Sequence, residues 1–144
     1  MSTAGGPPEE PFVAVLRPST ASAGIARELT VSRAHEWGVE ALADDLALVV
    51  TELVANAVRH AGTDIEVRLF PLGDGVRLEV ADSSTHPLRP RTATMMDEGG
   101  RGLLLVDALS ARSGVDADAS GKRVWAELRV DPESPWQEGP FEAG

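Results

Sequence analysis

The sequence contains no cysteine, so disulfides, thiolate metal sites and cysteine nucleophiles are all excluded. The missing thiols also fit a reducing compartment. No apolar run is long enough to span a bilayer, and residues 1–11 have neither the basic start nor the apolar core of a secretion signal. We therefore expect a soluble cytoplasmic protein that does not enter a membrane.

Basic residues are scarce: 13 Lys and Arg stand against 23 Asp and Glu, which gives a formal net charge of -10. A general affinity for nucleic acid or for an anionic membrane needs a positive surface, so we expect no direct nucleic-acid partner. A small polyanionic ligand would need local help from a cation, from backbone amides or from a few arginines.

The 144 residues predict one domain that can bury a core without disulfides or a structural metal. Residues 1–11 and 131–144 are rich in Gly, Pro, Ser and acids. That composition predicts flexible extensions on both sides of a domain at 12–130.

Hydrophobic periodicity and turn residues predict the elements of this domain. A strand at 12–16 precedes a helix that Ser19 or Thr20 can cap and that Gly38 ends. The elements after the central helix are a hairpin turning at 71–75, a long loop at 82–99, a helix at 102–109, and strands at 112–115 and 123–130. Strands in hairpins and helices that share one face predict a two-layer α+β sandwich.

The central helix carries the most informative residues. Glu52 and Asn56 are four residues apart, so both point the same way from the helix. They lie at the edge of an apolar stripe with three-four spacing, formed by Leu42, Leu46, Val49, Val50, Leu53, Val54, Ala57 and Val58. A solvated helix edge explains this pair on its own, whereas an acid and an amide lining a cleft would suit metal and phosphate chemistry.

Two further motifs favour the second interpretation. Asp82 ends an alternating strand, where it can turn the chain or accept hydrogen bonds from a ligand's exocyclic amine. Gly99, Gly100 and Gly102 open an apolar helix, and free amides at a helix start attract phosphate. Neither a Walker loop nor a dinucleotide fingerprint is present.

The order of Glu52-x-x-x-Asn56, Val80-Ala81-Asp82 and Gly100-Arg101-Gly102-Leu103 resembles the nucleotide-binding boxes of the superfamily of gyrase, the heat-shock ninety chaperone, sensor histidine kinases and mismatch-repair ATPases. Within it the chain resembles the branch of anti-sigma regulatory factor serine/threonine kinases. The resemblance covers roughly 18–128 and implies a Bergerat-type fold, with a mixed, mostly antiparallel sheet and helices on one face.

The resemblance also implies roles and ligands. Asn56 would ligate Mg²⁺, Glu52 would act as general base, and Asp82 would read the adenine amine of ATP. The amides of Gly100 and Gly102 would face the phosphates under a lid at 83–99, with Leu103 completing the box. The candidates for charge neutralisation are Arg59, Arg89, Arg91 and Arg101, of which Arg101 is the best placed.

Two positions depart from the family pattern. Asp82 is usually followed by glycines two and four positions on, but this chain continues Ser83-Ser84-Thr85-His86. A hydroxyl residue commonly supports this Asp from the start of the last strand, whereas here Gly121 and Lys122 precede Arg123. Ser83 or Ser84 are alternative sources of that hydroxyl.

These features predict an ATP- and Mg²⁺-dependent serine/threonine protein kinase that phosphorylates an anti-anti-sigma-type protein and sequesters a sigma factor. A non-catalytic adaptor that keeps the fold and acts by contact is the alternative, and a slow ATPase would use the same residues. A homodimer through Ile25 and Leu29 of the first helix is also open, although we expect both side chains to pack inside.

Overall fold

The computed structural model describes residues 10–60, 62–83 and 100–130, and only the backbone of residues 100–103. The lid predicted at 83–99, apart from Ser83, and both extensions, apart from Glu10 and Pro11, lie outside these residues. The elements are β1 (Phe12–Leu16), α1 (Ser22–Glu36), the short 3₁₀ helix η1 (Glu40–Leu42), α2 (Ala43–His60), β2 (Ile65–Leu72), β3 (Gly75–Asp82), α4 (Gly100–Leu109), β4 (Arg112–Asp118) and β5 (Gly121–Arg129).

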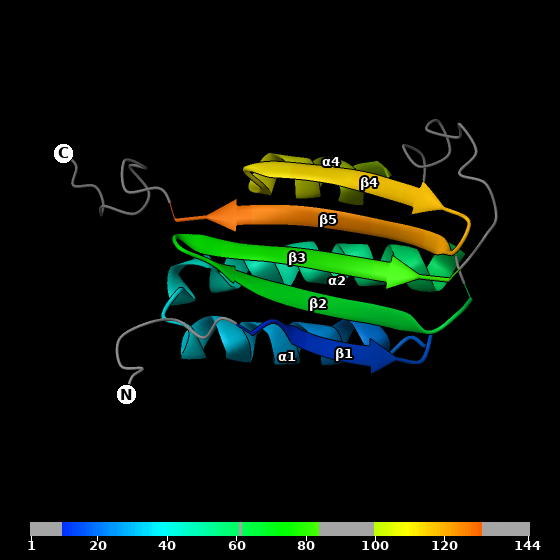
Figure 1. The fold of residues 1–144 in the computed structure, drawn as a ribbon, viewed down its shortest axis with the longest axis horizontal. Helices are drawn as coiled ribbons and strands as arrows, with labels where there is room; N and C mark the ends of the chain where they lie inside the picture. Colours follow the sequence, from blue (N-terminus) through cyan, green and yellow to red (C-terminus); the bar gives the residue numbers. More distant parts are fainter. Residues whose placement is uncertain (1–9, 61, 84–99, 131–144) are drawn as a thin grey trace.

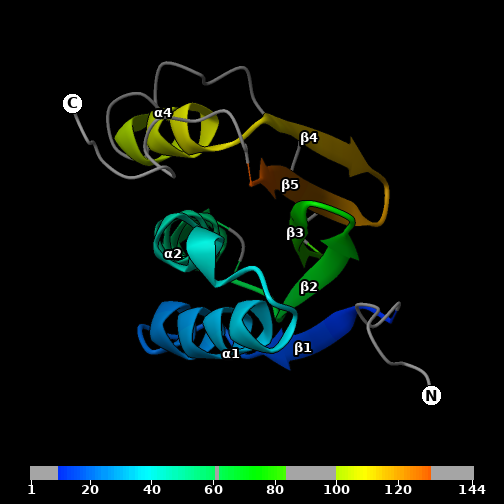
Figure 2. The same cartoon turned by 90° about the vertical axis from the view of Figure 1, so that its left-hand side faces the viewer.

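The described strands form one sheet in the order β1-β2-β3-β5-β4 (Figure 1). Each neighbouring pair of these strands is antiparallel. The helices α1, α2 and α4 cover a single face of the sheet (Figure 2). This arrangement confirms the predicted two-layer α+β sandwich, with every described strand pair antiparallel.

The core lies between α2 and the middle of the sheet. Because side chains alternate along a strand, one face of each central strand is apolar and packs against the helices. The predicted apolar stripe is confirmed, although its first residue, Leu42, belongs to η1. The buried residues are Leu42, Leu46, Val49, Val50, Leu53, Val54 and Ala57, and Val58 packs partly against them. Facing them are Ile65, Val67, Leu69, Val76, Leu78, Val80, Ala126 and Leu128.

The bounds of α2 follow from charge and backbone conformation. Asp44 and Asp45 occupy its first turn and Arg59 and His60 its last, each sign favoured there by the helix dipole. Gly62 follows with a φ of 72°, a conformation that glycine adopts without strain. The last turn of this helix is therefore held at a defined point, at the end of the sheet where β3 ends (Figure 1).

The start of α1 differs from the prediction. The helix begins at Ser22, and its N-cap residue Ala21 makes no side-chain cap hydrogen bond. Ser22 takes over the local bonding instead, because its Oγ donates to the carbonyl of Arg17 at 2.5 Å and accepts from the amide of Ser19 at 3.0 Å. The expected packing of Ile25 was also wrong, since this side chain is 46% exposed.

The closing hairpin is longer than predicted. β4 continues through Asp118 and β5 begins at Gly121, so the two strands are joined by a two-residue turn. The predicted helix at 102–109 is confirmed with an earlier start at Gly100. The hairpin register extends the pairing to residues 116–118, which have little tendency to form strand on their own.

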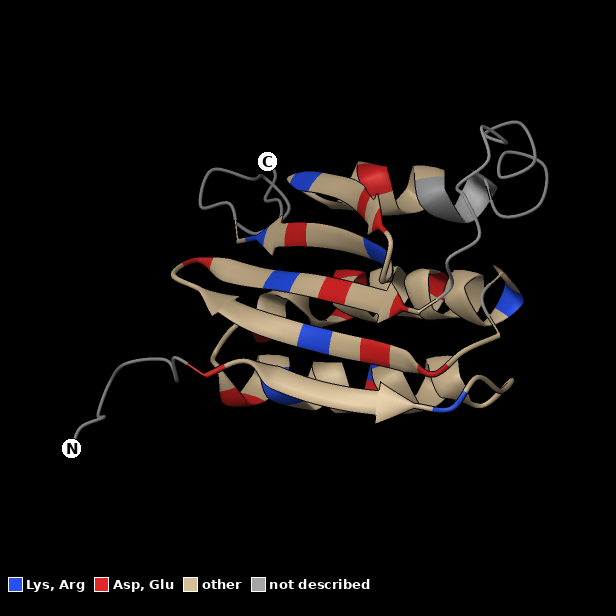
Figure 3. Cartoon of the chain, turned by 45° about the vertical axis from the view of Figure 1, so that its right-hand side comes forward, with Lys and Arg blue, Asp and Glu red and all other residues tan. Residues whose placement is uncertain are grey.

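On the face of the sheet that carries no helix, β2, β3 and β5 carry acidic and basic residues close together, whereas β1 carries none (Figure 3). Glu127, with its side chain 8% exposed, lies 2.9 Å from Arg77 and within 4 Å of Arg112 and Arg129. The guanidinium of Arg77 also lies 4.2 Å from the ring centroid of Trp125. These contacts let one face of the sheet meet water without exposing a continuous apolar surface.

Candidate functional site

The predicted motifs converge at one end of the molecule. The last turn of α2, the end of β3 and the start of α4 all lie at the same end of the sheet (Figure 1). α2 packs against both β3 and α4, so these elements are adjacent in space. Motifs separated by about fifty residues in the sequence are thereby brought to the same region.

Glu52 and Asn56 lie one turn apart on α2, and both are half-buried. The residues beside them, Leu53 and Ala57, are buried in the core. A side chain at the margin of a packed stripe is held by the helix while its polar end remains accessible. The geometry therefore matches the edge position predicted for this pair, and their chemical roles remain predictions.

Arg59 changes what Asn56 can do in this conformation. The Nη2 of Arg59 donates a hydrogen bond of 2.7 Å to Oδ1 of Asn56. That oxygen is the atom with which a carboxamide ligates a hard cation. A metal at Asn56 would thus compete with Arg59, which is exposed.

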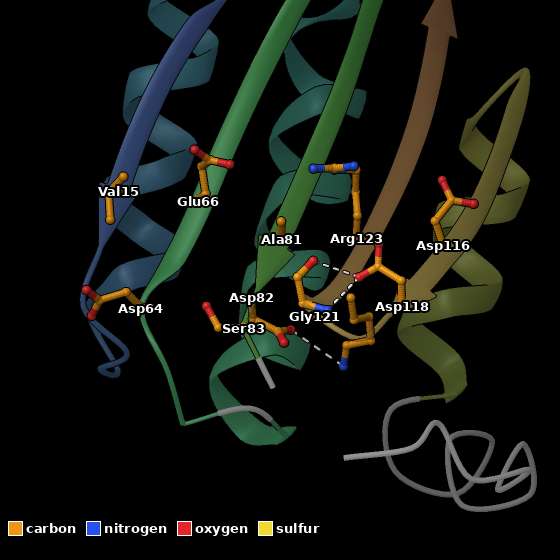
Figure 4. A pocket seen from close by; sticks show the side chains of 12 residues that line it. Val15, Asp64, Glu66, Ala81, Asp82, Ser83, Asp116, Asp118, Gly121 and Arg123 are labelled. Carbon is orange, nitrogen blue, oxygen red and sulfur yellow. Dashed lines mark hydrogen bonds and ion pairs between the residues drawn. The ribbon is translucent and has the colours of Figure 1, made fainter. Parts of the chain in front are cut away.

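Asp82 is buried where β3 ends, and its side chain is 2% exposed. Nζ of Lys122 lies 3.6 Å from its Oδ2, an ion pair drawn in Figure 4. The next residue is fixed as well, because the amide of Ser83 donates to Oγ1 of Thr63 at 3.1 Å. Sequence reasoning missed both Lys122 and Thr63, although pairing the strands at 75–82 and 121–129 would have set Lys122 opposite Asp82.

A hollow of about 360 Å³ opens beside this ion pair (Figure 4). It is lined by Val15, Asp64, Glu66, Ala81, Asp82, Ser83, Asp116, Asp118, Ser120, Gly121, Lys122 and Arg123. The hollow is thus bounded by strand ends, and Glu52 and Asn56 do not line it.

The carboxylate of Asp118 at this hollow is stabilised by its own turn. The hydroxyl of Ser120 donates to it at 2.7 Å and the backbone amide of Ser120 at 2.8 Å. These two hydrogen bonds, the hydroxyl bond first, hold the pKa of Asp118 below its ordinary value. Asp118 therefore stays negatively charged at neutral pH.

The glycine motif begins α4. Gly100, Arg101, Gly102 and Leu103 form its first turn, where only the backbone is described. The first amides of an α-helix have no partner within the helix, so this end attracts anions. Arg89 and Arg91 lie outside the described residues.

The side chains that could ligate a metal ion bear on the predicted Mg²⁺ site. Within residues 10–60, 62–83 and 100–130, no three His, Cys, Asp or Glu side chains gather as a metal site. Mg²⁺ in phosphate sites keeps most of its ligands from water and nucleotide and needs only one or two from the protein. The half-buried Asn56 beside Glu52 fits an ion of that kind.

None of the described helices is long and apolar enough to cross a membrane.

Comparison with known proteins agrees with this layout. A family model described as histidine kinase-like ATPase domain matches residues 16–128. The chain is also similar to Uncharacterized protein SCO4941 of Streptomyces coelicolor, with 36% identity over 88 residues, which cover 58% of this chain and 84% of that protein.

Proposed function

Because this chain belongs to the family of histidine kinase-like ATPase domains, whose members generally bind ATP with Mg²⁺, we propose that it is a serine/threonine protein kinase of the anti-sigma type. Its substrate is a hydroxyl of a small anti-anti-sigma-type protein, and it also holds a sigma factor. The observation that carries this proposal is the pair of Glu52 and Asn56 on α2, at the end of the sheet where Asp82 and the start of α4 also lie.

Each residue has a chemical task in this proposal. Asp82 accepts a hydrogen bond from the exocyclic amine of adenine, and the backbone amides of Gly100 and Gly102 face the phosphates. Asn56 holds Mg²⁺, which when bound neutralises charge on the phosphate oxygens. Arg101 adds a positive charge at the start of α4.

Arg59 is a second source of positive charge for the phosphates, and in the free protein it is hydrogen-bonded to Asn56. With nucleotide and metal bound, its guanidinium would leave Oδ1 of Asn56 and donate hydrogen bonds to the phosphates, a geometry that suits arginine. This exchange keeps the carboxamide occupied in the free protein. Together with Arg101 it would supply local positive charge in an otherwise acidic protein.

The transfer step needs one base. The partner's hydroxyl oxygen attacks the γ-phosphorus, the bond from that phosphorus to the β–γ bridging oxygen breaks, and ADP leaves with the bridging oxygen. Glu52 takes the hydroxyl proton as the new phosphorus–oxygen bond forms. A carboxylate within hydrogen-bond reach of the partner's hydroxyl suits this role, because it can accept that proton directly.

Titration calorimetry with ATP, with and without Mg²⁺, tests the nucleotide site. We expect Asn56→Ala to abolish the Mg²⁺-dependent part of binding, and Glu52→Ala to keep binding while slowing transfer by about 10²- to 10⁴-fold. Glu28→Ala, at an exposed acid on α1, is the matched control and should leave both ATP binding and the rate of phosphoryl transfer unchanged. Absence of measurable heat at millimolar ATP would refute the kinase.

An adaptor that regulates by contact alone is the second candidate. Two observations favour it: Ser84 and His86 stand where the family has glycines, and Arg59 occupies the oxygen of Asn56. Radiolabelled γ-phosphate separates the two, since a kinase labels its partner and an adaptor captures the partner without label. Free phosphate formed without any partner would instead indicate a slow ATPase.

A further inference from the structure

A buried carboxylate at the end of β3 requires compensation. The side chain of Asp82 is 2% exposed, and a charge removed from water to this degree is costly unless it is paired. The described structure supplies an ion pair from Lys122, whose side chain is 20% exposed and whose Nζ lies 3.6 Å from Oδ2. Asp82, which is proposed to recognise the adenine ring, is thus one member of an ion pair.

The fold builds this pair through strand register. Asp82 and Lys122 are direct partners across β3 and β5, on the same side as the buried pair Leu78 and Ala126. Gly121 makes the close approach possible, because a Cβ added there would lie 2.1 Å from the backbone oxygen of Asp82. The contact between Asp82 and Lys122 therefore follows from the sheet itself.

The pairing has a consequence for ligand recognition. An ionised carboxylate only accepts hydrogen bonds, and its two oxygens can serve two partners at once. With Lys122 beside Oδ2, the charge is balanced and the group is held in one orientation. A carboxylate has about four lone-pair sites, so Asp82 can pair with Lys122 and also accept a hydrogen bond from an amine.

We propose that Lys122 is a positioning residue that acts through Asp82 and sets the preference for a purine carrying an exocyclic amine. This inference rests on the proposed function, because it assumes that the protein binds a purine nucleotide. Lys122 does not contact the base in this proposal. Its effect is confined to how firmly Asp82 recognises the amine.

The test compares ATP with purine riboside triphosphate, which lacks only the 6-amine, by calorimetry on the full chain. We expect the unmodified protein to prefer ATP by about tenfold, the size of one charge-assisted hydrogen bond. Lys122→Met should reduce that ratio to below about threefold and leave the affinity for purine riboside triphosphate within about twofold. Lys122→Arg should restore the preference.

The matched control is Arg123→Met. It removes one positive charge from the next residue of β5, on the opposite side of the sheet, where Arg123 pairs with Glu79. This variant should keep the full preference for ATP. If it lowers the ratio as much as Lys122→Met, the effect belongs to net charge and the inference is refuted.

A double-mutant cycle provides a second measurement if Lys122→Met alone is unstable. In an Asp82→Asn background, replacing Lys122 should not change the ratio further, because the lysine acts only through the carboxylate. An unchanged ratio in Lys122→Met, or an equal loss of both nucleotides, would overturn the positioning role. If the unmodified protein binds neither nucleotide, the proposed function itself fails and this inference fails with it.

Discussion

Replacing Gly121 by alanine should strongly destabilise the domain, because the start of β5 lies against the backbone of β3. The added Cβ would meet the carbonyl oxygen of Asp82 at 2.1 Å and the Cα of Ser83 at 3.0 Å. Gly121 also has a φ of 145°, which disfavours any side chain. Since the atoms in the way belong to the main chain, no side-chain rotation relieves the contact.

The size of the effect follows from these two causes. A non-glycine residue in a sparsely populated backbone region costs about 1–3 kcal/mol. Inserting a methyl group into filled space costs about 1–3 kcal/mol more. We therefore expect Gly121→Ala to lower the free energy of unfolding by about 2–6 kcal/mol.

Urea denaturation followed by circular dichroism measures this change, with a shifted midpoint and an unchanged slope as the expected pattern. Gly73→Ala is the matched control, because a Cβ at this turn position meets nothing within 4 Å. Its stability should stay within about 0.5 kcal/mol of the unmodified protein or rise slightly. A loss below about 1 kcal/mol in Gly121→Ala would refute the argument that the two strand ends are in steric contact.

Three further substitutions test other parts of the fold. Leu53→Ala, at a core position 2% exposed, should cost about 2–5 kcal/mol in urea denaturation, and a smaller loss would argue against a packed α2. Arg77→Met should cost about 1–3 kcal/mol, since it removes the 2.9 Å partner of the buried Glu127. It should also change tryptophan fluorescence, because the guanidinium of Arg77 lies over the ring of Trp125. Unchanged stability would show that the remaining arginines suffice to pair with Glu127. Ser120→Ala should raise the pKa of Asp118 toward its ordinary value in an NMR titration. Because the folded-state pKa of Asp118 is lowered, its contribution to stability is present above the ordinary carboxyl pKa and is lost as pH falls through the lowered value, so the variant should lose part of it.

Much of the architecture could be predicted from local pattern. The α2 stripe follows a helical period, and acids at its start with bases at its end mark both boundaries. In the hairpin of β2 and β3, buried and half-buried residues alternate over 65–70 and 76–82. These elements carry their signal within a few residues, so tertiary context did not need to be known.

The errors arose where neighbours decide the structure. Asp116 and Asp118 have low strand propensity, yet they extend β4 because Arg123 and Gly121 pair with them across the hairpin. The helix start at Ser22 depends on its contact with the carbonyl of Arg17, five residues earlier. Such contacts become visible only when the chain is folded.

In the candidate site, too, some features could be predicted from spacing along the chain and others depend on the folded structure. Spacing alone predicted that Glu52 and Asn56 share one side of α2, and their half-buried positions agree with it. The pairing of Asp82 with Lys122 depends on strand register, which spacing within one element does not give. Asn56 and Arg59 have the i,i+3 spacing of helix neighbours, but the rotamers that join them are not given by spacing. The chemical roles of these residues stay predictions until nucleotide binding is measured.

The eighteen residues of α2 support the hydrophobic core and present the proposed base and metal ligand from the same rigid body. A cavity opened under Leu53 would tilt Glu52 together with it, because adjacent residues of one helix move as a unit. In the proposed kinase, substitutions that stabilise this helix would therefore also alter turnover. Thermal stability and phosphoryl transfer would then depend on the same segment.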